Sequence, residues 1–136
     1  MKTAVDSSVL LDVLGAEPVF GPASREALRA AFDGGALVAC DVVWAEVRAH
    51  FQDEADFEDA MRALGLSFSP LSREAARLAG ALWRRHHVTS QRPRSRVVAD
   101  FLIGAHAQVE ADALLTRDRG FFRSYFKDLQ VRQPAG

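Results

Sequence analysis

The stretch AVDSSVLL, residues 4–11, decides how the fold begins. Small and β-branched side chains before Asp6 predict a buried strand, because such residues pack well on a pleated sheet. After Asp6, a helix is predicted by apolar residues that recur at helical spacing, namely Val9, Leu10, Val13 and Leu14. Ser7 or Ser8 can cap this helix. Asp6 therefore ends a strand, where it could be a turn residue or a functional carboxylate.

The alternation of strand and helix continues along the chain. Further strands are predicted over residues 36–40, 111–116 and 129–133, the last at an edge. Further helices are predicted within residues 21–35, 41–51, 54–66, 72–87, 97–111 and 117–126, with a short connecting segment at 67–71 and a loop at 88–96. Strands that alternate with helices imply right-handed crossovers and a parallel sheet covered on both faces. We expect an α/β fold, a three-layer α/β/α sandwich with a central, mainly parallel sheet, formed by residues 1–136 as a single domain.

Composition narrows the class of protein. The chain has 136 residues, a net charge of −1 and one cysteine. This length can bury a core without disulfides, and a single cysteine excludes an internal disulfide framework and fits a reducing cytosol. Cys40 lies in a predicted buried strand, so it is expected to be an inert core thiol. No targeting segment or membrane span is recognisable, and a cytoplasmic location without membrane attachment is expected.

Four carboxylates occupy positions where apolar side chains are usual, or directly follow a buried strand: Asp6, Glu46, Asp100 and Asp118. Asp100 is the single charge in VVADFLIGAHA, residues 97–107. Glu46 is expected on a mainly buried helix face. On the predicted fold all four lie at the C-terminal edge of the sheet, where open α/β sheets place their sites.

These acids predict a metal site. Four unpaired carboxylates in one partly desolvated cleft would repel one another and raise one another's pKa. A divalent cation relieves this repulsion, and Mg²⁺ prefers such hard oxygen ligands. With a bound cation the cluster could hold phosphate oxygens and ionise a water. Ser8 and Thr116 could hold waters or carboxylates around the metal.

Each acid also has a separate structural explanation. The two acids that follow strands could be turn residues. Asp100 could be a first-turn acid favoured by the helix dipole and paired with Arg96. Glu46 could pair at the surface with Arg48 or His50. Four such coincidences at one edge of a sheet are less economical than one shared site.

Four blocks of the sequence resemble the motifs of PIN-domain ribonucleases, and most closely those of the VapC-type toxins of bacterial toxin–antitoxin pairs. In family order they are AVDSSVLLDVL (4–14), WAEV (44–47), RVVADFLIGAHA (96–107) and ALLTRDRGFF (113–122). The resemblance covers nearly the whole chain. Carried over position by position, the family's acidic quartet and its two hydroxyl residues correspond to Asp6, Glu46, Asp100, Asp118, Ser8 and Thr116.

The resemblance implies an activity and partners. It implies cleavage of RNA by a Mg²⁺- or Mn²⁺-dependent endoribonuclease, homodimerisation, and neutralisation by a small antitoxin encoded alongside. Hydrolysis by a metal-activated water would leave a 5′-phosphate and a 3′-hydroxyl. No position of the acidic quartet is lost, so an active enzyme is expected.

Basic and aromatic residues supply candidate RNA contacts. Residues 84–99 hold five arginines and two histidines without an acid, which fits either a solvated helix end or a surface for RNA phosphates. The candidates for phosphate contact are Arg94 and Arg96 in this segment, and Arg117 and Arg119 beside the last acid. Core or dimer contacts, rather than platforms for bases, are expected of Trp44, Trp83, Phe121 and Phe122.

Other classes of protein fit less well. A receiver-like domain would have an acidic pair after the first strand, where this chain has one acid. A haloacid-dehalogenase-type phosphatase would have a second Asp in place of Ser8. The sequence contains no GxxxxGK[ST] phosphate loop and no GxSxG elbow. Two alternatives stay open: a PIN-fold RNA-processing nuclease outside a toxin–antitoxin pair, and a non-catalytic module that binds metal or RNA.

Overall fold

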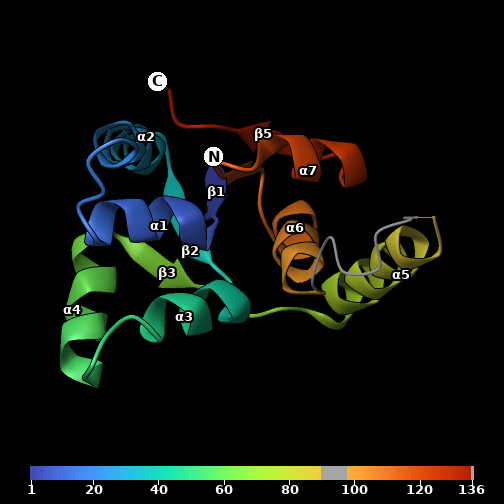
Figure 1. Cartoon of the computed structure of the whole chain (residues 1–136), viewed down its shortest axis with the longest axis horizontal. Coiled ribbons are helices and arrows are strands. Elements are labelled where there is room, and N and C mark those ends of the chain that lie inside the picture. Colours follow the sequence, from blue (N-terminus) through green and yellow to red (C-terminus); the bar gives the residue numbers. More distant parts are fainter. Residues whose placement is uncertain (90–97, 136) are drawn as a thin grey trace.

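Strands and helices alternate along the chain as the sequence predicts (Figure 1). The structure, a computed structural model, describes residues 1–89 and 98–135. Its strands are β1 (Lys2–Val5), β2 (Ala36–Ala39), β3 (Leu66–Phe68), β4 (Ala113–Leu115) and β5 (Gln130–Arg132). Its helices are α1 (Ser7–Leu14), α2 (Gly21–Asp33), α3 (Asp41–Arg48), α4 (Glu54–Ala63), α5 (Arg73–Thr89), α6 (Val98–Glu110) and α7 (Arg119–Tyr125). Most of the loop predicted over 88–96 lies outside the described residues.

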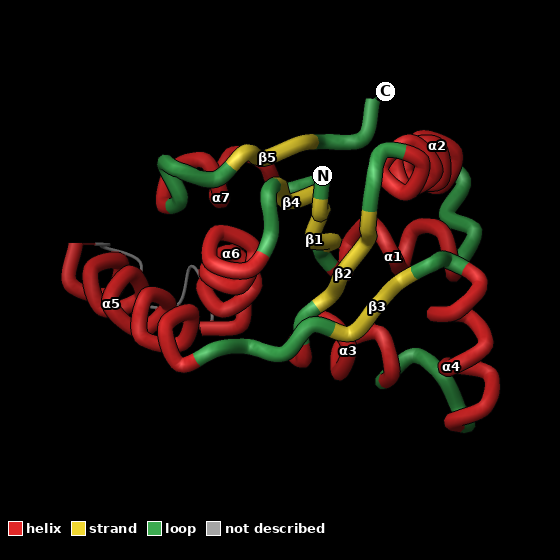
Figure 2. Tube along the Cα trace, turned by 180° about the vertical axis from the view of Figure 1, so that it is seen from behind, coloured by secondary structure: helices red, strands yellow, loops and turns green. Residues whose placement is uncertain are grey.

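The sheet has the order β3-β2-β1-β4-β5, and every neighbouring pair of strands is parallel. Right-handed crossovers follow from the twist of the strands. The connections from β1 to β2 and from β2 to β3 run along the sheet in one direction and place α1 to α4 on one face. The connections from β3 to β4 and from β4 to β5 run the other way and place α5 to α7 on the opposite face (Figure 2). This confirms the predicted α/β sandwich.

The centre of the sheet, between β1 and β4, is where the crossovers change direction. Val5 pairs with Leu115 in register. The backbone N–H of Asp6 then donates to the Leu115 carbonyl at 2.9 Å, which extends the pairing one residue beyond β1. Open α/β sheets bind ligands at such a switch point, beyond the carboxyl ends of the strands. Asp6 and Thr116, the residues after β1 and β4, are therefore brought together there.

The apolar helix α6 forms the centre of one helical layer. Phe101, Ile103 and Ala105 on this helix are buried. Gly104 allows close packing, because a Cβ added there would lie 2.3 Å from the ring of Phe126, well inside contact distance. Although α6 is strongly apolar, neither it nor any other helix within the described ranges is long and apolar enough to cross a membrane.

The sequence prediction is wrong at one strand. It treats residues 67–71 as a connecting segment, whereas Leu66–Phe68 pairs with β2 as β3. Leu66 is the one buried residue of this three-residue edge strand, so β3 lacks the apolar pattern by which a strand is recognised. Because the chain enters β3 at Leu66, α4 ends at Ala63 rather than continuing to residue 66. The predicted edge position of the last strand is confirmed by β5.

Candidate acidic active site

Asp6 connects β1 to α1 at the switch point of the sheet. It is the N-cap residue of α1 in an extended conformation, and it is 7% exposed. Two hydroxyls meet its Oδ2 atom: Thr116 Oγ1 donates at 2.7 Å and Ser8 Oγ donates at 3.2 Å. Oδ1 receives no hydrogen bond from the described residues. One carboxylate oxygen is thus fixed by the fold, while the other is left for a ligand.

Thr116 joins the two central strands. It is fully buried, and its hydroxyl oxygen accepts a hydrogen bond from the backbone N–H of Asp118 at 3.0 Å while it donates to Asp6. Asp118 is half-buried and is the N-cap residue of α7. The hydroxyl of Thr116 therefore fixes both the carboxylate of Asp6 and the main chain that carries Asp118.

Glu46 comes from α3, and its position differs from the sequence prediction. It is exposed, so the expectation of a mainly buried helix face is wrong. The surface pairings considered for it are also wrong, because Arg48 pairs with Glu54 at 3.1 Å and His50 Nδ1 contacts the Glu46 backbone carbonyl. Instead, Ser7 Oγ donates to Glu46 Oε1 at 2.9 Å. Ser7 was missed as a site residue because its position fits a helix cap equally well.

Asp100 lies in the first turn of α6, as predicted, and is half-buried. Its charge reaches Glu46. Partial burial of the Glu46 carboxyl group raises its pKa above the ordinary value of 4.5. The hydrogen bond from Ser7 lowers this pKa, whereas the negative charges of Asp6 and Asp100 raise it. The carboxylates of Asp6, Glu46 and Asp100 therefore share one electrostatic environment.

The donor set fits a hydrated divalent cation. No three His, Cys, Asp or Glu side chains among residues 1–89 and 98–135 are gathered closely enough to form a ready metal site. Mg²⁺ keeps several waters and takes one or two carboxylates directly, so carboxylates that are not in one tight cluster can still contact it through waters. All the donors are hard oxygens, and Asp6 is already oriented by two hydroxyls. Asp6 is thus the side chain best placed to bind a cation directly.

The raised pKa of Glu46 predicts a measurable pH effect. Below pH 4.5 the carboxyl is protonated in both the folded and the unfolded chain, so it costs no stability. As the pH rises through its raised pKa in the folded chain, ionisation destabilises the fold. Glu46→Gln should therefore raise the melting temperature at neutral pH in a chelator, and this gain should disappear below pH 4.5. Thermal melts across this range test the effect, with Glu26→Gln on α2 as the control. A variant that melts lower at neutral pH would show that the hydrogen bond from Ser7 dominates.

Arg117 does not extend into the acidic site. Its Nε donates to Asp12 Oδ2 at 2.7 Å and its Nη2 donates to Asp12 Oδ1 at 3.1 Å. Ser24 Oγ also donates to Asp12 Oδ2, at 2.9 Å, and the guanidinium lies 4.2 Å above the centre of the Phe20 ring. Asp12 is 3% exposed, so this is a buried, bidentate ion pair. Sequence reasoning missed Asp12, although a lone charge inside the apolar helix SSVLLDVL was a detectable signal.

The remaining residues predicted as RNA contacts differ in where the structure places them. Arg119 is exposed at the first residue of α7, beside Asp118, and is accessible to a ligand. Arg94 and Arg96 lie outside the described residues. Arg117 is held by Asp12, which gives it a structural role, and its phosphate contact stays a prediction. Among the predicted aromatic contacts, Phe121 and Phe122 are buried and Trp44 packs against the core.

The parallel α/β sheet places carboxylates and hydroxyls at its switch point, beyond the carboxyl ends of its central strands. The model of the PIN domain family matches residues 3–127. The chain belongs to the PIN domain family. No curated protein sequence matches it.

Solved structures share the fold at low sequence identity. A chain in the crystal structure of VapBC2 from Rickettsia felis, bound to a DNA fragment from its promoter, is 15% identical with a TM-score of 0.74, and the match covers 98% of both chains. DNA-bound VapBC from Salmonella typhimurium gives 12% identity, a TM-score of 0.71 and 99% of both chains. A toxin–antitoxin complex from Klebsiella pneumoniae gives 18% identity, a TM-score of 0.68 and 98% of both chains.

Proposed function

We propose that this protein is a metal-dependent endoribonuclease that acts as the toxin of a toxin–antitoxin pair. The observation that carries the proposal is the buried carboxylate of Asp6, held at the sheet switch point by the Thr116 hydroxyl at 2.7 Å. Membership of the PIN domain family supports it, because proteins of this family are generally nucleases. The acids Glu46, Asp100 and Asp118 complete the proposed site.

Each part of the site has a task in this proposal. A bound Mg²⁺ or Mn²⁺ would polarise a water and stabilise charge on the phosphodiester oxygens. Asp6 would hold the cation, and the hydroxyls of Thr116 and Ser8 would keep its carboxylate in one orientation. Glu46, whose pKa is raised, would take up a proton more readily than an ordinary glutamate. Asp100 and Asp118 would complete the negative charge around the cation.

The proposed partners follow from the likeness to known complexes. The matching structures are toxin–antitoxin complexes, so we propose that a small antitoxin protein binds and inhibits this chain. RNA is the proposed substrate and a homodimer the proposed assembly. Two alternatives remain, an RNA-processing nuclease of the same fold without an antitoxin, and a module that binds metal or RNA without turnover.

Cleavage of a pool of structured RNAs by the purified chain tests the proposal. We expect cleavage with Mg²⁺ or Mn²⁺, none with a chelator, and products that carry a 5′-phosphate. Asp100→Asn, purified in parallel, should be inactive and so control for contaminating ribonuclease. Cleavage that persists in this variant or in chelator would refute the site. Growth inhibition on expression that survives the same substitution would favour the binding module.

A further inference from the structure

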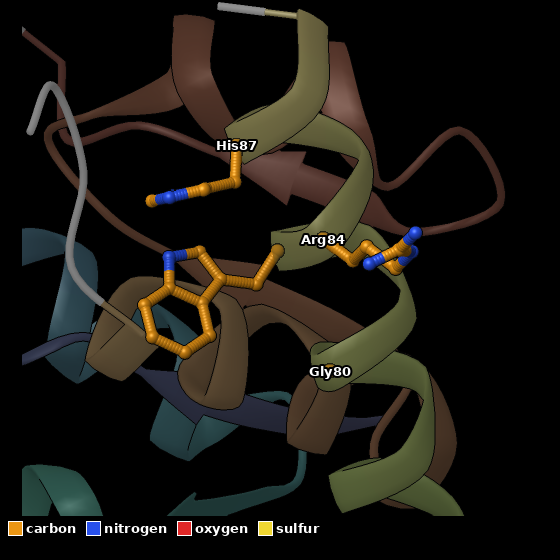
Figure 3. Close-up of a pocket in the computed structure, with 4 residues that line it drawn as sticks. Gly80, Arg84 and His87 are labelled. Carbon is orange, nitrogen blue, oxygen red and sulfur yellow. The ribbon is translucent and has the colours of Figure 1, made fainter. Parts of the chain in front are cut away.

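The last turns of α5 carry a hollow that lies apart from the acidic side chains. Its lining comes from Gly80, Trp83, Arg84 and His87, and its volume is about 300 Å³ (Figure 3). Figure 3 shows Arg84 and His87 leaving the helix above Gly80 on different sides. Trp83 is 37% exposed, and its ring meets the His87 ring edge-on with 6.3 Å between centroids. An accessible indole therefore borders the hollow. Of the two contacts predicted for Trp83, the core contact is wrong and the dimer contact stays a prediction.

Gly80 has no explanation in the packing of this chain. It lies in the interior of α5, and a Cβ added to it would meet no described atom within 4 Å. A glycine inside a helix costs about 1 kcal/mol relative to alanine. Its effect here is to keep the floor of the hollow open beside Trp83.

Positive charge follows the same face of the helix. Arg73, Arg77 and Arg84 are exposed, and their spacing of four and seven residues places them in one row. At 1.5 Å per residue, the row extends for about 16 Å. Glu74 is the single acid in α5. A row of this length and charge is complementary to the backbone of a nucleic acid.

The helix α5 packs against α6, the helix that carries Asp100. His86, next to His87, has its ring centroid 5.6 Å from that of Phe101 and is hydrogen-bonded to the Tyr125 hydroxyl. Phe101 directly follows Asp100 on α6, and α5 and α6 lie side by side in both views (Figures 1 and 2). An RNA segment bound on this face of α5 would therefore lie on the pair of packed helices that carries Asp100.

We propose that this face of α5 binds a single-stranded segment of RNA. An unpaired base would stack on the Trp83 indole over Gly80, and phosphates would contact Arg77 and Arg84. Aromatic faces bind unstacked bases of any sequence, and arginines hold the connecting backbone. The inference rests on the proposed function, whose RNA substrate it would position beside the acids.

A second copy of the chain is a poorer occupant for this face. A two-fold symmetric contact places the same patch on both partners. The arginine row would then oppose another arginine row, and like charges brought together are unfavourable. RNA meets the same row with opposite charge.

Binding and cleavage can be tested separately on the full chain. In the Asp100→Asn background, fluorescence anisotropy would measure affinity for a labelled single-stranded oligoribonucleotide pool and for the same RNA as a duplex. Trp83→Ala should weaken single-strand binding about tenfold and duplex binding much less. Gly80→Leu should stabilise the helix yet weaken binding, because it fills the hollow. Arg84→Gln should lower the salt dependence of binding by about one ion. Phe32→Ala, an exposed aromatic on α2 across the sheet, should change nothing.

The outcomes separate this inference from the proposed nuclease. If Trp83→Ala and Gly80→Leu bind RNA as tightly as the parent while the wild-type chain cleaves RNA, the α5 inference is wrong and the nuclease stands. If the wild-type chain never cleaves but these variants lose RNA binding, the α5 inference stands alone. If Trp83→Ala instead converts a dimer to a monomer in light scattering at unchanged RNA affinity, the face is a contact between copies and the inference is overturned.

Discussion

Asp6→Asn is expected to reduce metal-dependent RNA cleavage by more than about 100-fold, because it removes the charge of the most deeply buried acid in the proposed site. Asn keeps the size of the side chain and can still accept hydrogen bonds from Thr116 and Ser8. The loss should therefore come from weaker cation binding and not from misfolding. Initial rates over a range of Mn²⁺ concentrations measure it, alongside a thermal melt of the same preparation.

A second, milder substitution removes the hydroxyl that orients Asp6. Thr116→Val leaves the carboxylate in place. It removes the hydrogen bond that the Thr116 hydroxyl donates to Asp6 and the one that it accepts from the Asp118 backbone N–H. A loss of roughly 10- to 100-fold is typical when the group that orients a metal ligand is removed. We expect this loss to shrink at high Mn²⁺. Asp6→Asn with full activity and an unchanged metal requirement would exclude Asp6 from the site.

Arg117→Met should lower the free energy of unfolding by roughly 2–3 kcal/mol. Loss of one partner leaves the carboxylate of Asp12 buried without its ion pair, which is strongly destabilising. The effect should fall below that of a fully buried pair because the side chain of Arg117 is 34% exposed. Met retains the aliphatic part of the contact with Phe20. Urea unfolding, monitored by circular dichroism, gives the free energy of unfolding and its dependence on urea concentration.

A double-mutant cycle shows whether the ion pair is the cause. Asp12→Asn keeps an acceptor for the Ser24 hydroxyl, so the pair Asp12→Asn with Arg117→Met should cost less stability than Arg117→Met alone. Arg119→Met is the matched control, because Arg119 is exposed at the first residue of α7, two positions further along the chain. Unchanged stability in Arg117→Met, combined with a reduced salt dependence of RNA binding, would return Arg117 to the surface that binds RNA.

The sequence contained most of the fold because the apolar patterns were strong. Short apolar runs such as ALVAC and ALLT alternate with segments of helical periodicity, and this alternation predicts a parallel sheet. The predicted α/β class is confirmed. The same patterns placed Asp6 and Thr116 at the ends of two strands, and the structure shows that these strands are neighbours and that the two side chains are hydrogen-bonded. Features that depend on chain connectivity and on periodic burial could be predicted without coordinates.

Contacts between particular side chains could not be predicted from the sequence. A helical period could not show that Glu46 is exposed and held by Ser7, because serine at a helix start already has a reason to be there. Arg117 adjoins Asp118 in the sequence, but its guanidinium pairs with Asp12, which is 105 residues away along the chain. The partner of a long, flexible side chain is decided by tertiary packing, which local patterns do not encode.

The bond between Asp6 and Thr116 spans 110 residues, so the site is a property of the complete sheet. The carboxylate of Asp6 is oriented in this way only once β1 has paired with β4. Contacts this distant in sequence form late in folding, since they close the longest loops. A nascent or partly unfolded chain would therefore carry every acid of the site and still be harmless to RNA. The geometry of the site would therefore depend on the pairing of β1 with β4 and not on any local segment of the chain.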